Sequence, residues 1–147
     1  RKRVKKMDID RKKFKRMMVL ISRIDEVYYR ALKSIGIKDN LFVLLYAIYD
    51  GETYSQKRIC DEWLIPKTTL NTIVNECVRE GYVELVPSGG REKKIVLTEA
   101  GRTFAESVLE PIFKAESRTA QWLEESDVLE KMEEFTYMLE NDFGTME

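Results

Sequence analysis

The sequence predicts a mainly α-helical fold with one small β-hairpin, on the basis of three observations. Residues 66–80 place apolar side chains at helical spacing on one side and polar side chains on the other. Residues 55–64 form a second short helical pattern just before it, which is the spacing of a helix-turn-helix. Two β-rich segments, 82–87 and 94–97, then surround the turn Ser88-Gly89-Gly90-Arg91. Together these elements predict a winged helix-turn-helix.

Capping residues define both helices of the pair. Pro66 suits a first helical position, and Gly81 suits the end of the same helix. Ser55 is the expected N-cap of the preceding helix. We expect the inner faces of the two helices to consist of Ile59, Trp63 and Leu64 in the first, and of Leu70, Ile73, Val74, Cys77 and Val78 in the second.

Two helices are expected before this pair. Residues 8–33 keep apolar spacing over several turns, and residues 41–49 form a shorter, largely buried helix capped by Asp39 or Asn40. The apolar residues of the long helix are Phe14, Met17, Met18, Ile21, Ile24, Tyr28, Ala31 and Leu32.

Two further helices follow the hairpin. The first runs from Thr98, its N-cap, to about residue 120, and Pro111 inside it predicts a kink. Ser126-Asp127 caps the second, residues 128–141. The first and last helices carry apolar stripes that one small lobe cannot cover, so we expect a second copy to bury them. The whole chain, 1–147, is thus one unit with a winged lobe at 39–97 and helical dimerisation regions at 8–34 and 98–147.

Charge is distributed unevenly along the chain. Residues 1–18 carry ten Lys/Arg against two Asp/Glu, residues 55–97 seven against six, and residues 99–147 four against thirteen. The acidic C-terminal part argues against that part lying on nucleic acid, whereas the near-neutral lobe neither demands nor excludes a polyanion. The basic residues 11–16 could contact phosphate, although a solvated helix face is the simpler interpretation.

The composition argues against an enzyme. The chain has no histidine, which removes His-dependent acid–base catalysis, catalytic triads and His-ligated metals. Cys60 and Cys77 fall on expected inner faces and are interpreted as small buried residues. No phosphate-binding glycine loop is present, and no cofactor or metal is expected.

No apolar run reaches the roughly 18 to 20 residues that span a bilayer, so we expect a cytoplasmic protein without a membrane partner. The sequence begins with Arg1 and has its first methionine at Met7. Two interpretations of residues 1–6 stay open. They can be native sequence whose upstream start is missing, or they can themselves be an added leader.

The sequence resembles the multiple-antibiotic-resistance regulator (MarR) family of bacterial and archaeal transcription factors. The resemblance lies in residues 41–49, in SQKRICDEWLIPKTTLNTIVNECVREGYVE from residue 55, in the glycine turn with Arg91, and above all in LTEAG at 97–101, which opens a helix. It implies a homodimer with interlocked terminal helices and two winged lobes on a palindromic operator. It also implies that a small molecule or an oxidant often releases the DNA.

Three departures from the family pattern predict fewer and less charged DNA contacts. The wing of the family usually carries Asp-x-Arg, and here Gly89-Gly90-Arg91 keeps only the arginine. Thr72 stands where the recognition helix often has Arg, and Leu64 where the turn often has Gly. The branch that senses organic hydroperoxides uses a cysteine near the start of its chain, which neither cysteine here matches.

The candidate DNA-binding residues lie on the second helix of the pair and on the wing. Asparagine can pair with adenine through two hydrogen bonds and threonine can contact a thymine methyl group. A wing arginine can reach the minor groove or the flanking phosphates. The candidates are Lys67, Thr68, Thr69, Asn71, Thr72, Asn75, Arg91 and Lys93, and for each the alternative is a solvated side chain.

Family ligand sites lie between the dimer helices and the winged lobe, and the aromatic residues Tyr28, Tyr29, Phe42 and Tyr46 could line such a site or belong to the core. The sequence therefore predicts a homodimeric transcriptional regulator that binds double-stranded DNA and acts as a repressor. A small-molecule effector could release it from the DNA. The alternative is a winged helix that serves as a protein-interaction module. The operator, the regulated genes and the effector cannot be read from the sequence.

Overall fold

The computed structural model describes residues 2–146, and the side chains of residue 8 and of residues 10–146. The chain divides into two compact units, Arg1–Leu109 and Glu110–Glu147. The first unit holds α1 (Lys2–Ile35), α2 (Asp39–Ile48), β1 (Tyr54–Ser55), α3 (Gln56–Trp63), α4 (Lys67–Arg79), β2 (Val83–Pro87), β3 (Lys93–Leu97) and the first turns of α5 (Glu99–Glu125). The second holds the rest of α5 and α6 (Val128–Gly144).

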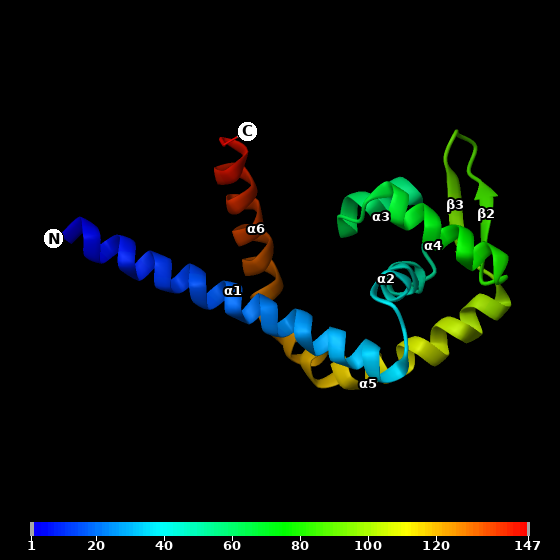
Figure 1. Ribbon diagram of the computed structural model, residues 1–147, viewed down its shortest axis with the longest axis horizontal. Coiled ribbons are helices and arrows are strands. Elements are labelled where there is room, and N and C mark those ends of the chain that lie inside the picture. The colour runs from blue at the N-terminus through cyan, green and yellow to red at the C-terminus, as the bar shows by residue number, and fades with distance from the viewer. Residues whose placement is uncertain (1, 147) are drawn as a thin grey trace. The chain divides into compact units, whose positions relative to one another are not determined.

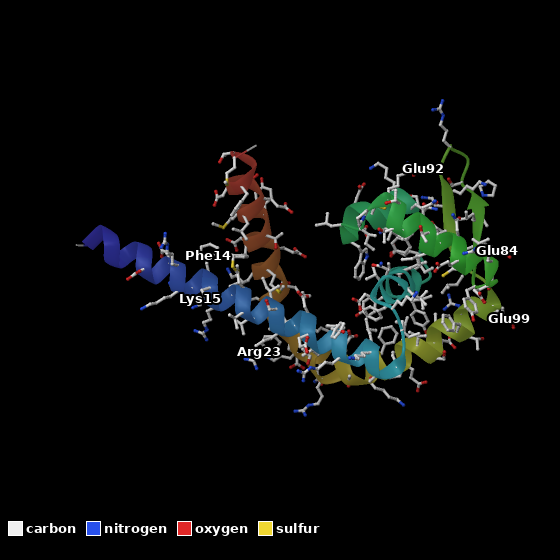
Figure 2. The ribbon with its side chains drawn as sticks, viewed as in Figure 1. Phe14, Lys15, Arg23, Glu84, Glu92 and Glu99 are labelled. Atoms are coloured by element: carbon white, nitrogen blue, oxygen red, sulfur yellow. The ribbon has the colours of Figure 1, made fainter. Side chains whose placement is uncertain are left out.

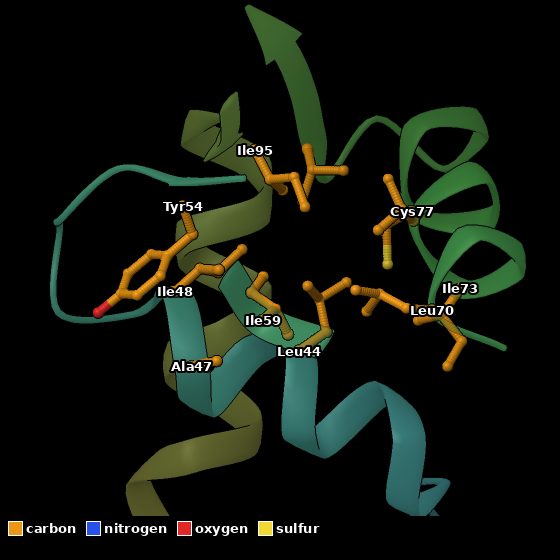
Figure 3. Packing of buried hydrophobic residues seen from close by; sticks show 11 residues of the cluster. Leu44, Ala47, Ile48, Tyr54, Ile59, Leu70, Ile73, Cys77 and Ile95 are labelled. Carbon is orange, nitrogen blue, oxygen red and sulfur yellow. The ribbon is translucent and has the colours of Figure 1, made fainter. Parts of the chain in front are cut away.

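The winged lobe is built around one apolar core. Side chains from α2, α3, α4 and the sheet converge on it, among them Leu44, Ile59, Leu70 and Ile95, none of which is exposed to solvent (Figure 3). The buried stripe expected on α4 is confirmed at Leu70, Ile73, Val74 and Cys77. This core fixes which side of α4 faces outward, because rotating the helix would expose the stripe.

The sheet has three strands rather than the two expected. β2 and β3 pair antiparallel as the wing, with Leu85 opposite Ile95, and the hairpin stands beside α4 (Figure 1). The two-residue strand β1 pairs with the other edge of β3. Sequence analysis missed β1 because two residues are too few to show an alternating pattern.

The caps of the lobe helices agree with the sequence in part. The Ser55 hydroxyl accepts a hydrogen bond from the Arg58 backbone N–H, so Ser55 is the N-cap of α3 as predicted. The placement of Pro66 was wrong, because it is the N-cap of α4 and Lys67 is the first helical residue. The cap of α2 was also wrong: Lys38 occupies that position and makes no side-chain cap bond.

Three side chains expected on inner faces are exposed instead. Leu64 adopts a left-handed conformation (φ 52°) that ends α3, and this turns its side chain outward to 86% exposure. Trp63 and Val78 lie at the edges of their helical stripes and are also exposed. A leucine at a left-handed position costs about 1 kcal/mol or more, a cost that glycine avoids.

A compact joint connects α4, the wing and α5. α4 ends in a Schellman motif, in which the N–H groups of Gly81 and Tyr82 donate to the carbonyls of Val78 and Cys77. Thr98 then ties this turn to α5, since its hydroxyl donates to the Gly81 carbonyl (2.5 Å) and accepts from the Gly101 N–H (2.9 Å). Its backbone N–H donates to the Tyr82 carbonyl at 3.0 Å. Thr98 is therefore the N-cap of α5, as predicted.

Glycine is required at position 101. A Cβ built there would lie 1.7 Å from the Tyr82 carbonyl oxygen, a backbone atom that cannot move aside without breaking the joint. The Tyr82 and Phe104 rings stack on one another, with centroids 4.3 Å apart and planes 7° apart. This contact gives a physical reason for the glycine of the LTEAG segment.

The helices outside the lobe expose many apolar side chains. α1 is longer than predicted, and Phe14, Met18, Ile21 and Ile24 along it are all exposed within the single chain; Figure 2 marks Phe14. α6 buries none of its residues, and Met132 and Phe135 are exposed. Asp127 is the N-cap of α6 without a side-chain bond, and Pro111 lies inside α5 as expected, while the predicted kink stays a prediction.

Replacing Gly101 by alanine should destabilise the protein by about 2 to 4 kcal/mol, because the new methyl group must displace the Tyr82 backbone. Gly90→Ala is the matched control, since a Cβ at Gly90 meets nothing within 4 Å. Urea unfolding followed by circular dichroism measures both variants. Equal unfolding midpoints would show that the Gly101 contact is not structurally important.

Candidate nucleic-acid interface

The outer face of α4 is a continuous row of short polar side chains. Thr68, Asn71, Thr72 and Asn75 recur every three or four residues, and all four are exposed, as is Lys67 at the start of the helix. Thr69 is half-buried and so belongs only partly to this row. The Thr72 hydroxyl donates to the Thr68 carbonyl at 3.0 Å, so its oxygen can still accept a hydrogen bond.

The wing places two of the predicted cations beside α4. Its tip is closed by the Ser88 hydroxyl, which donates to the Glu92 carbonyl at 2.5 Å, and by Gly89 with φ 81°. Arg91 and Lys93 are both exposed, and Arg91 makes no ion pair with any residue that the structure describes. Its guanidinium is therefore available to an external anion.

A groove of about 620 Å³ runs between α3, the start of α4 and the wing. Three of the candidate residues, Lys67, Arg91 and Lys93, line it together. Figure 2 marks Glu92 in this region, which with Asp61 contributes negative charge to the same groove. The groove thus brings the start of α4 and the wing into one surface of mixed charge.

Lys57 is a groove cation that sequence reasoning missed. Its ammonium group donates to Asp61 at 2.6 Å, and this hydrogen bond raises the pKa of Lys57 above its usual value. The i, i+4 spacing of the two residues on α3 was visible in the sequence, but nothing there placed α3 beside the wing. Because the pair is exposed, it contributes little to stability.

A second polar cluster surrounds β1. The Tyr54 hydroxyl donates to Asp50 at 2.5 Å, which lowers the pKa of Asp50 and raises that of Tyr54 to about 12. The Arg58 guanidinium lies 4.3 Å from the centroid of the Tyr54 ring and pairs with Glu62 at 2.8 Å. Since these partners face one another, we interpret the cluster as structural rather than as part of the groove.

The four aromatic residues proposed for an effector lie together. Tyr28, Tyr29, Phe42 and Tyr46 all line a pocket of about 640 Å³ formed by α1, α2 and the end of α3. Phe42 itself is buried, so it is shared between the pocket and the core, whereas Tyr29 is exposed. Sequence reasoning missed Trp63 and three carboxylates of the same pocket. Two of these, Asp25 and Glu26, precede Tyr28 and Tyr29 by three residues and could have been found from that spacing.

The two cysteines differ in their surroundings. Cys77 is buried in the core, and burial raises the pKa of its thiol to about 11. Cys60 is only half-buried and lines the groove, so the expectation that both are core residues is confirmed for Cys77 alone. Within residues 2–146 no helix is both long and apolar enough to cross a membrane.

Comparison with known proteins relates the winged lobe to one family. Residues 35–93 match the model of the MarR family, which covers the lobe from the end of α1 to the start of β3. The NMB1585 regulator of Neisseria meningitidis, a MarR family protein, is 25% identical, with a TM-score of 0.62 over 84% of this chain and 94% of that one. The winged lobe is therefore similar in sequence to MarR family proteins. The resemblance and the fold class predicted from the sequence are both confirmed.

More distant MarR-type structures share the fold. AbfR of Staphylococcus epidermidis, solved in its reduced form bound to DNA, is 18% identical, with a TM-score of 0.64 over 95% of this chain and 98% of AbfR. The MarR family regulator SPO1453 of Silicibacter pomeroyi is 19% identical, with a TM-score of 0.62 over 83% and 90% of the two chains. No curated protein matched the sequence. This chain therefore shares the fold of these solved structures over most of its length.

At pH 8 iodoacetamide should alkylate Cys60 in the folded protein and leave Cys77 unmodified. A pKa of about 11 leaves roughly one Cys77 thiol in a thousand ionised at that pH, and the core also excludes the reagent. Raising the pH toward 11 should increase Cys77 labelling, because the reactive thiolate forms above the pKa. Mass spectrometry of the labelled peptides measures both sites, with labelling in urea as the control. Equal labelling rates in the folded protein would contradict this placement of Cys77.

Proposed function

We propose that this chain is a homodimeric transcriptional repressor that inserts α4 into the major groove of a palindromic operator and places its wing at the minor groove. The observation that carries the proposal is the exposed row of Thr68, Asn71, Thr72 and Asn75 beside a wing whose Arg91 is unpaired. The match of residues 35–93 to the MarR family model supports it, as does the existence of a DNA complex of AbfR, which shares the fold. Repression would take place in the cytoplasm.

The α4 face is suited to base contacts rather than to charge attraction. Of the exposed residues from 67 to 75 only Lys67 is charged, and asparagine side chains can pair with adenine in two hydrogen bonds. Thr72 presents its methyl group, which can contact a thymine methyl. We assign sequence discrimination to Asn71, Thr72 and Asn75, and contacts to the phosphate backbone to Lys67, Thr68 and the partly buried Thr69.

The wing is assigned to the backbone and the minor groove. Arg91 has no neighbouring aspartate to orient it, so it is free to follow phosphates or groove width rather than one base edge. Lys93 lines the groove together with Arg91 and would add a phosphate contact.

Dimer formation accounts for the exposed apolar stripes. The side chains of α1 and α6 that one chain leaves accessible are those that an obligate interface would cover. The stripes that we assign to the dimer are Phe14, Met18, Ile21, Ile24 and Tyr28 on α1, and Val128, Met132, Phe135 and Leu139 on α6.

A small-molecule effector would bind in the pocket of Tyr28, Tyr29, Phe42 and Tyr46. The pocket has a volume typical of small-molecule sites and adjoins α3, the first helix of the helix-turn-helix. Binding there could shift the position of the recognition helix and so release DNA.

A protein-interaction module is the second candidate, because the residues of the lobe from 55 to 97 are nearly neutral in charge. A mobility-shift assay with fragments of the source genome separates the two functions. A regulator retards a few fragments at nanomolar concentration and in the presence of competitor DNA, whereas an interaction module retards none selectively.

Asn71→Ala should reduce the preference for operator over random DNA by roughly 1 to 3 kcal/mol, the value of one bidentate base contact. Thr72→Ala should have a smaller effect in the same direction, since only a methyl contact is lost. Glu84→Ala on the outer strand β2 is an exposed control. Titrations with operator and with random duplexes give the ratio of the two dissociation constants. An unchanged ratio in both α4 variants would place recognition elsewhere.

Arg91→Ala should weaken binding to operator and to random DNA by similar factors, because a phosphate contact carries no sequence information. It should also reduce the dependence of log K on log salt concentration by about one counterion. Arg91→Lys, which keeps the charge, should restore most of the salt dependence. A loss confined to operator DNA would instead assign Arg91 to a base contact.

A further inference from the structure

The pocket formed by α1, α2 and the end of α3 is lined by carboxylates as well as by aromatic rings. Its lining includes three carboxylates, Asp25, Glu26 and Asp39, and contains neither lysine nor arginine. Three helices contribute to it, so the combination was not visible as one segment of sequence. The pocket is therefore both aromatic and negatively charged.

Four rings form a continuous aromatic wall. The centroids of Tyr28 and Phe42 lie 6.1 Å apart, and those of Phe42 and Tyr46 lie 5.2 Å apart. The indole of Trp63 meets Tyr46 edge-on at 6.0 Å. The faces of such rings attract cations through the negative part of their quadrupole, and Trp and Tyr do so most strongly.

The three carboxylates differ in whether they pair with a cation of the described part of the chain. Glu26 pairs with Arg30 at 2.6 Å on the exposed side of α1. Asp25 and Asp39 make no ion pair with any residue among 2–146. The pocket consequently offers two unpaired negative charges beside an aromatic wall.

We propose that this pocket binds an organic cation with an aromatic or bulky apolar body. The rings would contact the apolar body and the positive centre, and Asp25 and Asp39 would supply the opposing charge. An organic anion of the same shape would meet repulsion from both carboxylates. As a statement about the effector, this inference rests on the proposed function and names the class of its ligand.

Two probes of nearly identical shape and opposite charge test the proposal, tetraphenylphosphonium and tetraphenylborate. Trp63 and Trp122 are the only tryptophans, so Trp122→Phe leaves Trp63 in the pocket wall as the sole indole reporter. In this background tetraphenylphosphonium should quench the Trp63 fluorescence with a Kd at least about tenfold lower than that of tetraphenylborate. Equal binding of the two ions, or tighter binding of the borate, would overturn the proposal.

A double variant and a control variant test the charges assigned to Asp25 and Asp39. Asp25→Asn and Asp39→Asn together should raise the Kd of tetraphenylphosphonium by about tenfold and lower that of tetraphenylborate, because removing negative charge affects the two ions in opposite directions. Asp10→Asn, an exposed aspartate on α1 outside the pocket, is the matched control and should change neither. If the double variant binds the phosphonium ion as the parent does, the site is not this pocket.

The test of the cation site and the test of the proposed function can succeed or fail independently. Fluorescence titration without DNA measures the pocket, and a mobility shift without the phosphonium ion measures the regulator. Charge-selective quenching supports the cation site even where no fragment is retarded, and its absence overturns the cation site even where operator binding is tight.

Discussion

The contact between Gly101 and the Tyr82 carbonyl is the constraint on which the rest of the lobe depends. It allows α5 to start directly against the turn that ends α4, where the Thr98 side chain bonds both segments. The turn that ends the recognition helix, the start of the wing and the first turn of α5 therefore meet within a few residues. A side chain at position 101 would separate these elements, and neither the α4 face nor the wing could then be held in register.

Much of this arrangement follows from the sequence because its signals are local. The caps at Ser55 and Thr98, the stripe from Leu70 to Cys77 and the hairpin depend on neighbours within a few residues. The errors have physical reasons. Leu64 turned outward because its left-handed backbone overrides the helical pattern, and β1 was too short to show alternation. Asp39 and Trp63 could not be assigned to the aromatic pocket from the sequence, because neither lies on the helix that carries Asp25 and Glu26.

The same limit applies to the candidate DNA site. The outward row on α4 could be predicted from periodicity, but the meeting of Lys57, Lys67 and Arg91 in one groove required the fold. That groove is mixed in charge, so nonspecific attraction to phosphate should be weak in one lobe. In the function that we propose, selective binding depends on base contacts from two lobes together. Dimer formation would then connect the exposed apolar stripes of α1 and α6 to DNA recognition.

Footprinting of selected DNA tests this account most directly. Random duplexes selected by the full chain, then probed by hydroxyl-radical cleavage in its presence, report where the protein contacts the backbone. Two lobes joined as a dimer predict protection of two inverted half-sites whose centres lie about one helical turn, roughly 34 Å, apart. Protection of a single short site at saturating protein, or selection without any repeated sequence, would contradict the account.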